Sequence, residues 1–323
     1  YGSANCRSAL FMVQIDAPSN VKFFDTGKGS CLSNATQNGM STPSLVDYDG
    51  DRIIDAVFAG DLLGNLWKFD FSAATWKIAL LGQPMFTTAS GQPITAPVEV
   101  GPAPSDASGK AMVYFGTGRY LLSGDETNKT VQTFYGLLDE DKVVTSLNKQ
   151  SIGYEDANAR VVFDGNDGTV NWKSQQGWYL DLLPPSGTAQ GERVLSPPLL
   201  RYGRVIFNTS IPSADPCVLG GTGWLMELEA ATGSTLSYSA LDMNDDGLFD
   251  EKDYVVIGKD NKGNDIKSPV AGKKSGSMSL NQPTVITAGA KEFKFNSDIK
   301  KGISVITEKS GTSNPRSSWR QLQ

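Results

Sequence analysis

Apolar residues along this chain occur in short runs in which apolar and polar positions alternate, and the runs end in Gly, Asn or Asp. This period of two is typical of strands, whereas the 3.6-residue period of an amphipathic helix is scarce. β-branched and aromatic residues are frequent in the runs, as expected for pleated, half-buried segments. The sequence therefore predicts an all-β protein.

Four of the runs share one pattern, a glycine followed by an alternating strand and then an acid. They read "GNLWKFD", "GLLDED", "GWYLDL" and "GWLMELE", and begin at Gly64, Gly136, Gly177 and Gly223. Three of them follow a partner run, "AVFAGDLL", "MVYFGTGRYLL" or "RVIFNTSIPS", that ends in a turn of small or polar residues. A hairpin repeated about every 40 to 50 residues has the period of a propeller blade. That period predicts about seven blades in a single propeller domain, residues 1–323, in preference to two sandwiches.

The segment "LDMNDDGLFDEKDY" has oxygen-bearing side chains at the spacing of a calcium-binding loop. Counted from Asp242, the oxygen donors at positions 1, 3, 5, 7, 9 and 12 are Asp242, Asn244, Asp246, the carbonyl of Leu248, Asp250 and Asp253, with Gly247 at position 6. Calcium takes 6 to 8 oxygen ligands, and a glycine permits the sharp turn between them. We expect this loop between two strands, "STLSYSA" and "YVVIGK". The alternative is a polar surface turn rich in Asp and Asn.

A second acidic segment, "VDYDGDRIIDAVFAGD", repeats this spacing earlier in the chain. Its candidate ligands at positions 1, 3, 5, 7 and 9 are Asp47, Asp49, Asp51, the carbonyl of Ile53 and Asp55, with Gly50 at position 4 and Arg52 at position 6. Four carboxylates this close repel one another unless a cation lies between them. We therefore expect calcium here too, the alternative being an acidic turn that binds no ion.

Composition narrows the chemistry further. The chain contains no histidine, which excludes Ser-His-Asp and Cys-His catalysis and makes a zinc site improbable. We expect no enzyme activity, with a calcium-dependent pyrroloquinoline quinone dehydrogenase as the enzymatic alternative.

The net charge is −6 although residues 291–323 are basic, so no nucleic-acid partner is expected. No apolar stretch is long enough to span a bilayer.

The cysteines bear on the compartment through the disulfide that two of them can form. Cys6 and Cys31 flank a segment rich in Gly, Ser and Asn that has few apolar residues to bury. A disulfide between them would stabilise it by roughly 3 kcal/mol on the chain-entropy estimate, and we predict that pairing. Cys217 would then be free or paired outside this chain. A disulfide places the protein outside the cytoplasm.

Several segments together resemble one family, the PilC/PilY proteins of bacterial type IV pili. They are "TPSLVDYDGDRIIDAVFAGDLLGNLWKFD", "VYFGTGRYL", "TFYGLLD", "GERVLSPPLLRYGRVIFNTSIPSADPC", "GGTGWLMELEAATG" and "RSSWRQL". They occur from about residue 40 to the end. The resemblance is to the C-terminal domain of these proteins, so the chain is expected to be a fragment of a larger one.

The resemblance implies a modified seven-bladed, quinoprotein-like β-propeller with inserted calcium-binding loops. It implies a surface, outer-membrane or pilus-tip location, contact with minor pilins, and a role in balancing pilus extension against retraction, in twitching motility and in adhesion to a host-cell receptor. Both acidic loops fall where the family carries metal loops. Arg52 departs from the loop pattern, and no Arg-Gly-Asp triplet is present. The alternatives are a quinoprotein dehydrogenase propeller and a carbohydrate-binding propeller.

Overall fold

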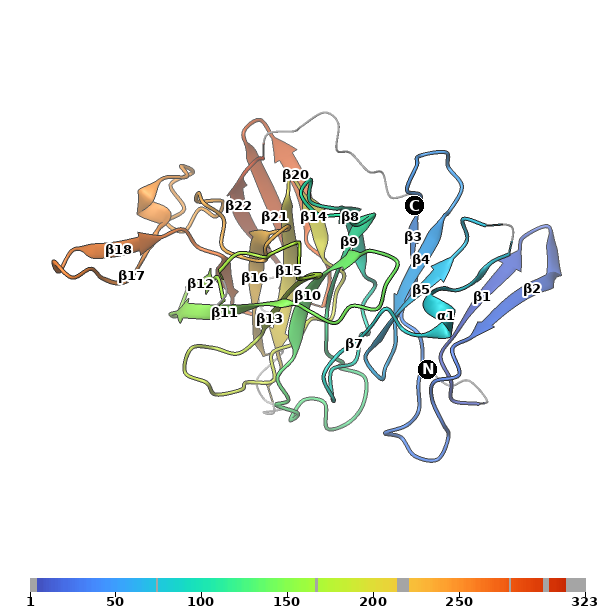
Figure 1. Ribbon diagram of the computed structural model, residues 1–323. Coiled ribbons are helices and arrows are strands. Elements are labelled where there is room, and N and C mark those ends of the chain that lie inside the picture. The colour runs from blue at the N-terminus through green and yellow to red at the C-terminus, as the bar shows by residue number, and fades with distance from the viewer. Residues whose placement is uncertain are drawn as a thin grey trace.

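Strands dominate the computed structural model, which describes residues 5–73, 75–165, 168–213, 221–278, 280–298 and 302–311. Two smaller sheets lie at the N-terminal side of the body (Figure 1). The first is the hairpin of β1 (Ala9–Gln14) and β2 (Ala17–Asp25); the second contains β3 (Ser44–Val46), β4 (Ala56–Gly60), β5 (Asn65–Asp70), β6 (Lys77–Ile78) and β7 (Phe86–Thr87), with the short helix α1 (Ala79–Gly82) after β6.

A ten-stranded path forms the centre. In spatial order it contains β14 (Leu199–Arg201), β15 (Arg204–Ile211), β16 (Thr222–Glu229), β19 (Gly272–Ser275), β12 (Ala159–Phe163), β11 (Asn148–Glu155), β13 (Gly177–Asp181), β10 (Thr133–Asp139), β9 (Ala111–Gly116) and β8 (Glu99–Pro102). Two further sheets are the projecting hairpin of β17 (Val255–Lys259) and β18 (Asp265–Ser268), and the C-terminal sheet of β20 (Thr284–Ala288), β21 (Lys291–Asp298) and β22 (Gly302–Lys309). The 3-10 helix η1 (Glu251–Asp253) precedes β17. The prediction of an all-β fold is confirmed.

The repeated hairpins of the sequence are present. β4 pairs antiparallel with β5, β9 with β10, and β15 with β16. Almost every residue of these six strands is buried, because layers cover both faces, and this explains their nearly continuous apolar character.

Large aromatic side chains fill the space between the strands. Trp67, Trp178 and Trp224 are fully buried, and the indole N–H of Trp178 donates to the Ala230 carbonyl at 3.0 Å. A Cβ on Gly136 would lie 2.6 Å from the Trp178 ring. The glycine of this repeated run is therefore required by packing, since any side chain would displace the indole.

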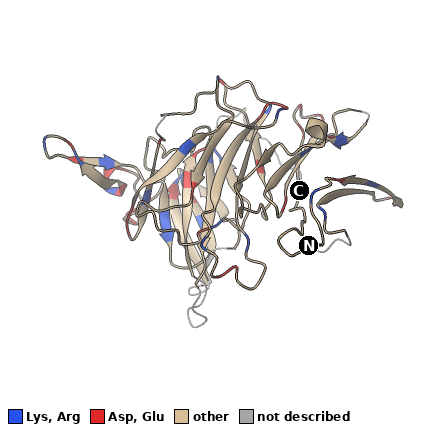
Figure 2. Ribbon diagram, turned by 60° about the horizontal axis from the view of Figure 1, so that its bottom comes forward, with Lys and Arg blue, Asp and Glu red and all other residues tan. Residues whose placement is uncertain are grey.

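In the C-terminal sheet many charged side chains face the body and many apolar side chains face the solvent, the reverse of the usual pattern. Its buried inner face carries Glu292, Lys294, Asn296 and Glu308. On its outer face Ile286 is 53% exposed, Val305 50% and Ile303 65%, beside the half-buried Phe293 and Phe295. Figure 2 shows acidic and basic positions close together on strands in the interior of the body. The inner face also carries the buried Ile306, so this sheet contacts the body through both charged and apolar side chains.

One predicted strand is wrong. Residues 234–240, "STLSYSA", form no strand, and only an isolated bridge joins Leu241 to Glu308. The Thr235 hydroxyl donates to the Val162 carbonyl at 2.9 Å and accepts from the Val162 N–H at 2.8 Å. At this point the side chain of Thr235, and not its backbone, pairs with β12.

The N-terminal hairpin is tied at its base. A disulfide joins Cys6 to Cys31, with the Cα atoms 5.1 Å apart. Leu10, Met12 and Phe24 pack against the apolar cluster around Trp67 and Phe69. Cys217 lies outside the described residues. None of the described helices is long and apolar enough to cross a membrane.

Candidate metal centre

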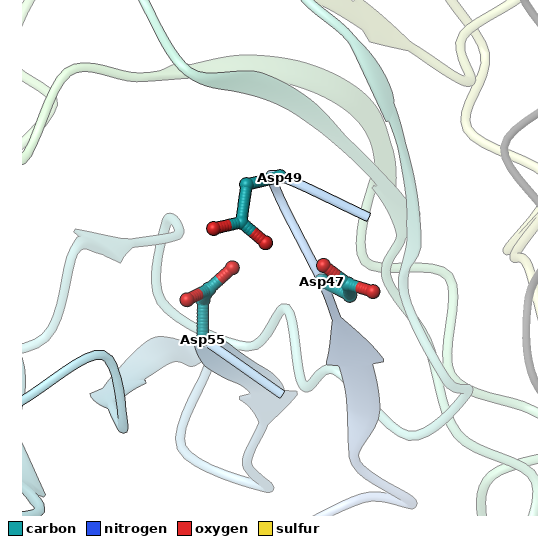
Figure 3. A group of neighbouring side chains, drawn as sticks. All are labelled: Asp47, Asp49 and Asp55. Atoms are coloured by element: carbon teal, nitrogen blue, oxygen red, sulfur yellow. The ribbon is translucent and has the colours of Figure 1, made fainter. Parts of the chain in front are cut away.

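The first acidic loop, residues 47–55, connects β3 to β4 at the end of a buried sheet. Asp47 directly follows β3 and Asp55 directly precedes β4, so both side chains start from ordered strand ends. One carboxylate oxygen from each of Asp47, Asp49 and Asp55 lies within 4.8 Å of the other two, and Figure 3 shows the three groups converging. Oxygens about 2.3 to 2.6 Å from one calcium ion are at most about 5 Å apart. This spacing is compatible with a single shared calcium ion.

Backbone N–H groups shape this loop. Asp47 accepts from Gly50 at 2.7 Å and from Arg52 at 2.8 Å. Burial raises the pKa of Asp47, but these backbone hydrogen bonds lower it by more, so the pKa lies below its usual value. Asp51 accepts from the Ile53 N–H at 2.7 Å. Asp51 and Ile53 thus lie in the loop, while the converging group contains only the other three predicted side chains.

Tyr48 connects the first loop to a neighbouring sheet, a link that the sequence pattern does not reveal. Its N–H donates to Asp55 at 2.7 Å, and its hydroxyl donates to Asp139, the last residue of β10, at 2.6 Å. Burial, followed by the Asp139 charge, raises the pKa of Tyr48 far above its usual value, so the hydroxyl stays protonated. Lys68 from β5 pairs with Asp139 at 2.7 Å and also with Asp141. The loop is therefore anchored to two sheets.

The second acidic loop, residues 242–253, lies between β16 and β17. Asp242 is 2% exposed. Its Oδ2 accepts from the Gly247 N–H at 2.8 Å, whereas its Oδ1 is buried without a hydrogen-bond partner among the described residues. A buried, unpartnered carboxylate oxygen is costly, and a bound cation would satisfy it.

The end of the second loop is held by its own carboxylates. Asp253 is 1% exposed, and its two oxygens accept from the N–H groups of Met243 and Asp250, at 2.8 and 3.0 Å. Asp250 caps η1 by accepting from Lys252 at 2.8 Å. Asp242, Asp246 and Asp250 do not form a carboxylate group as close as that of the first loop within the described chain. Asp253 therefore stabilises the loop in this structure by joining its beginning, at Met243, to its end, at Asp250.

The two loops follow the same course position by position. In each, position 1 accepts from the N–H of position 6, position 3 from position 5, and position 5 from position 7. Positive φ occurs in both at position 4, in Gly50 and Asp245, and at position 6, in Arg52 and Gly247. The first loop thus has its glycine at position 4 and a strained non-glycine residue at position 6, and in the second loop these two positions are swapped. Arg52 keeps the shape of the loop at a conformational cost.

Comparison with known proteins places the chain in a family. Residues 1–159, which include the first loop, match the family described as the PilY1 beta-propeller domain. A type IV pilus biogenesis factor PilY1 homolog of Xylella fastidiosa is 34% identical over 259 residues, 72% of this chain and 17% of that protein. The chain belongs to the PilY1 family.

Other PilY1 proteins cover more of the chain. The type IV pilus biogenesis factor PilY1 of Pseudomonas aeruginosa is 27% identical over 309 residues, 81% of this chain and 26% of that protein. The crystal structure of the P. aeruginosa PilY1 C-terminal domain matches with a TM-score of 0.74 and 24% identity, over 97% of this chain and 68% of that one. The chain thus spans between 17% and 26% of the length of these curated relatives.

Proposed function

We propose that this PilY1-family domain binds calcium and regulates type IV pilus extension against retraction. The observation that carries the proposal is the convergence of Asp47, Asp49 and Asp55 within 4.8 Å in the part of the chain that matches the family. Carboxylate and carbonyl oxygens are the ligands that calcium prefers. The full proposed ligand set adds Asp51 and Ile53 in the first loop, and Asp242, Asn244, Asp246, Leu248 and Asp250, with Asp253, in the second.

The setting of this function follows from the family. The relatives are named type IV pilus biogenesis factors, which supports a place at the cell surface or pilus tip and contact with minor pilins. Twitching motility and adhesion to a host-cell receptor are further parts of the proposal, as is a non-enzymatic role. We also propose that residues 1–323 form one seven-bladed, quinoprotein-like propeller, as the hairpin period supports.

Calcium titration tests the proposal directly. We expect the purified, chelator-treated domain to bind calcium with dissociation constants of roughly 10⁻⁴ to 10⁻³ M, the range of extracellular modules. Asp49→Ala should abolish binding at the first loop, and Asp246→Ala binding at the second. Asp156→Ala, in an exposed turn outside both loops, should leave binding unchanged.

A cellular measurement connects binding to the pilus. Cells that carry Asp49→Ala should show altered numbers of surface pili and altered twitching zones, whereas Asp156→Ala cells should match the wild type. The proposal is wrong if the wild-type domain binds no calcium at about 10⁻² M, 10-fold above the upper end of the expected range of dissociation constants. It is also wrong if variants that no longer bind calcium retain normal piliation and twitching.

A further inference from the structure

The C-terminal sheet contacts the body largely through charged side chains, and Ile306 of β22 adds one buried apolar contact, in a cluster with Ile206 and Leu225. Arg201, Arg204 and Lys294 meet Glu227, Glu292 and Glu308 where the sheet contacts β14, β15 and β16. The six charges sum to zero, and five of these side chains are buried almost completely. Burial lowers the pKa of Lys294 to about 8, which reflects the cost of removing its ammonium group from water. Buried ion pairs contribute little net stability relative to apolar contacts of similar volume, because desolvation offsets most of their attraction.

The second loop supplies a separate attachment, because its first residue and the two residues before it pair with β22. The Asp242 N–H donates to the Thr307 carbonyl at 3.2 Å, and the Lys309 N–H donates to the Ala240 carbonyl at 2.8 Å. Leu241 forms a bridge with Glu308 between them. The first residue of the loop is therefore also a backbone partner of the C-terminal sheet.

Two lysines place the same loop between the C-terminal sheet and the central path. Lys273 of β19 donates to the Asp242 carbonyl at 2.7 Å and pairs with Asp245 at 3.3 Å. The Lys291 ammonium of β21 lies 2.6 Å from the position that a Cβ on Gly247 would take. The loop thus touches strands on both sides of the junction.

We propose that calcium bound in the second loop clamps β20, β21 and β22 onto the central strands, so that ambient calcium controls the docking of the C-terminal sheet. This inference rests on the proposed calcium function and deepens it. The buried, unpartnered Oδ1 of Asp242 is the observation that points to a cation. An ion on that oxygen holds Asp242 in the position from which its N–H reaches Thr307. Without the ion the carboxylates of the loop repel one another, and the pairing with β22 opens.

Hydrogen exchange with and without calcium tests the clamp. Binding to the docked form alone slows opening by a factor of 1 + [Ca²⁺]/Kd, so calcium at 100 times Kd should slow exchange in β20, β21 and β22 about 100-fold. In the Asp49→Ala protein, whose first loop should stay empty, the amides of β4, β5, β9 and β10 should not respond to calcium. A chelator should reverse the effect.

Matched variants assign the response to the loop. Asp242→Asn keeps an acceptor for the Gly247 N–H but weakens the cation site, and should remove the calcium response of the C-terminal sheet. Asp246→Asn, at an exposed position, should do the same and serves if Asp242→Asn does not fold. Glu251→Gln removes one charge from an exposed side chain beside these ligands and should retain the response.

Two results would overturn the clamp, and they differ from a failure of the calcium proposal. If titration shows the second loop filled but β20, β21 and β22 exchange at the same rate, the clamp is wrong while calcium binding stands. If all strands gain equal protection, the ion is a general stabiliser and not a clamp. If neither loop binds calcium, the proposed function fails and the clamp fails with it.

Discussion

Asp61 is a fully buried carboxylate that receives its hydrogen bonds from neutral donors. Its Oδ2 accepts from the indole N–H of Trp67 at 2.8 Å, and from the side-chain amides of Asn38 and Asn65 at 2.9 and 3.0 Å. Its Oδ1 accepts from the backbone N–H groups of Leu63 and Asn65, at 3.0 and 2.9 Å. The residue therefore ties the turn between β4 and β5 to the segment that precedes β3.

Replacing Asp61 with Asn should destabilise the protein substantially. The side chain keeps its shape, but an NH₂ group would face the three N–H donors that now share Oδ2. Each buried donor left without an acceptor costs about 1 to 3 kcal/mol, and relief of the buried charge offsets part of the sum. We expect a loss of about 3 kcal/mol in the free energy of unfolding.

Urea denaturation at neutral pH measures this loss. Asp156→Asn is the matched control, since Oδ1 of Asp156 accepts two backbone N–H groups in an exposed turn and an Asn oxygen can do the same. That control should cost less than about 1 kcal/mol. An Asp61→Asn protein as stable as the control would refute the account of Asp61 as an obligatory acceptor.

Two other predictions concern pH and backbone strain. Burial raises the pKa of Glu99 from 4.5 to about 7, so the folded protein binds this proton more tightly than the unfolded chain and loses stability as pH rises from 4.5 to 7. Glu99→Gln can still accept the backbone hydrogen bond from Leu200. In thermal melts this variant should be up to about 3 kcal/mol more stable than wild type at pH 8 and equally stable at pH 4. An equal gain at both pH values would contradict this. Arg52 has a φ of 74°, a conformation that glycine adopts at lower cost. Arg52→Gly should therefore raise the free energy of unfolding by about 0.5 to 1 kcal/mol and strengthen calcium binding at the first loop. Reduced stability in urea denaturation would contradict this and show that the arginine side chain makes a stabilising contact.

Local pattern was enough to predict the hairpins and the two acidic loops. The runs that begin at Gly64, Gly136 and Gly223 are strands paired with the runs before them, because alternation and turn residues act over a few neighbouring positions. The loop spacing likewise brings together groups only a few residues apart. The strand expected at 234–240 does not form, and there it is the Thr235 side chain that bonds to the backbone of Val162, 73 residues away.

Contacts distant in sequence decided the rest. The link from Tyr48 to Asp139 spans 91 residues, and no periodicity signals it. The alternation in "KEFKFNSD" is typical of a strand, and these residues form β21, yet by the usual rule Phe293 and Phe295 would face inward. In the folded protein Glu292 and Lys294 face inward instead. There Glu292 pairs with Arg204 and Lys294 pairs with Glu227, both on the central strands. Which face of a strand is buried depends on the surface it meets, and that surface exists only after the distant segments have come together.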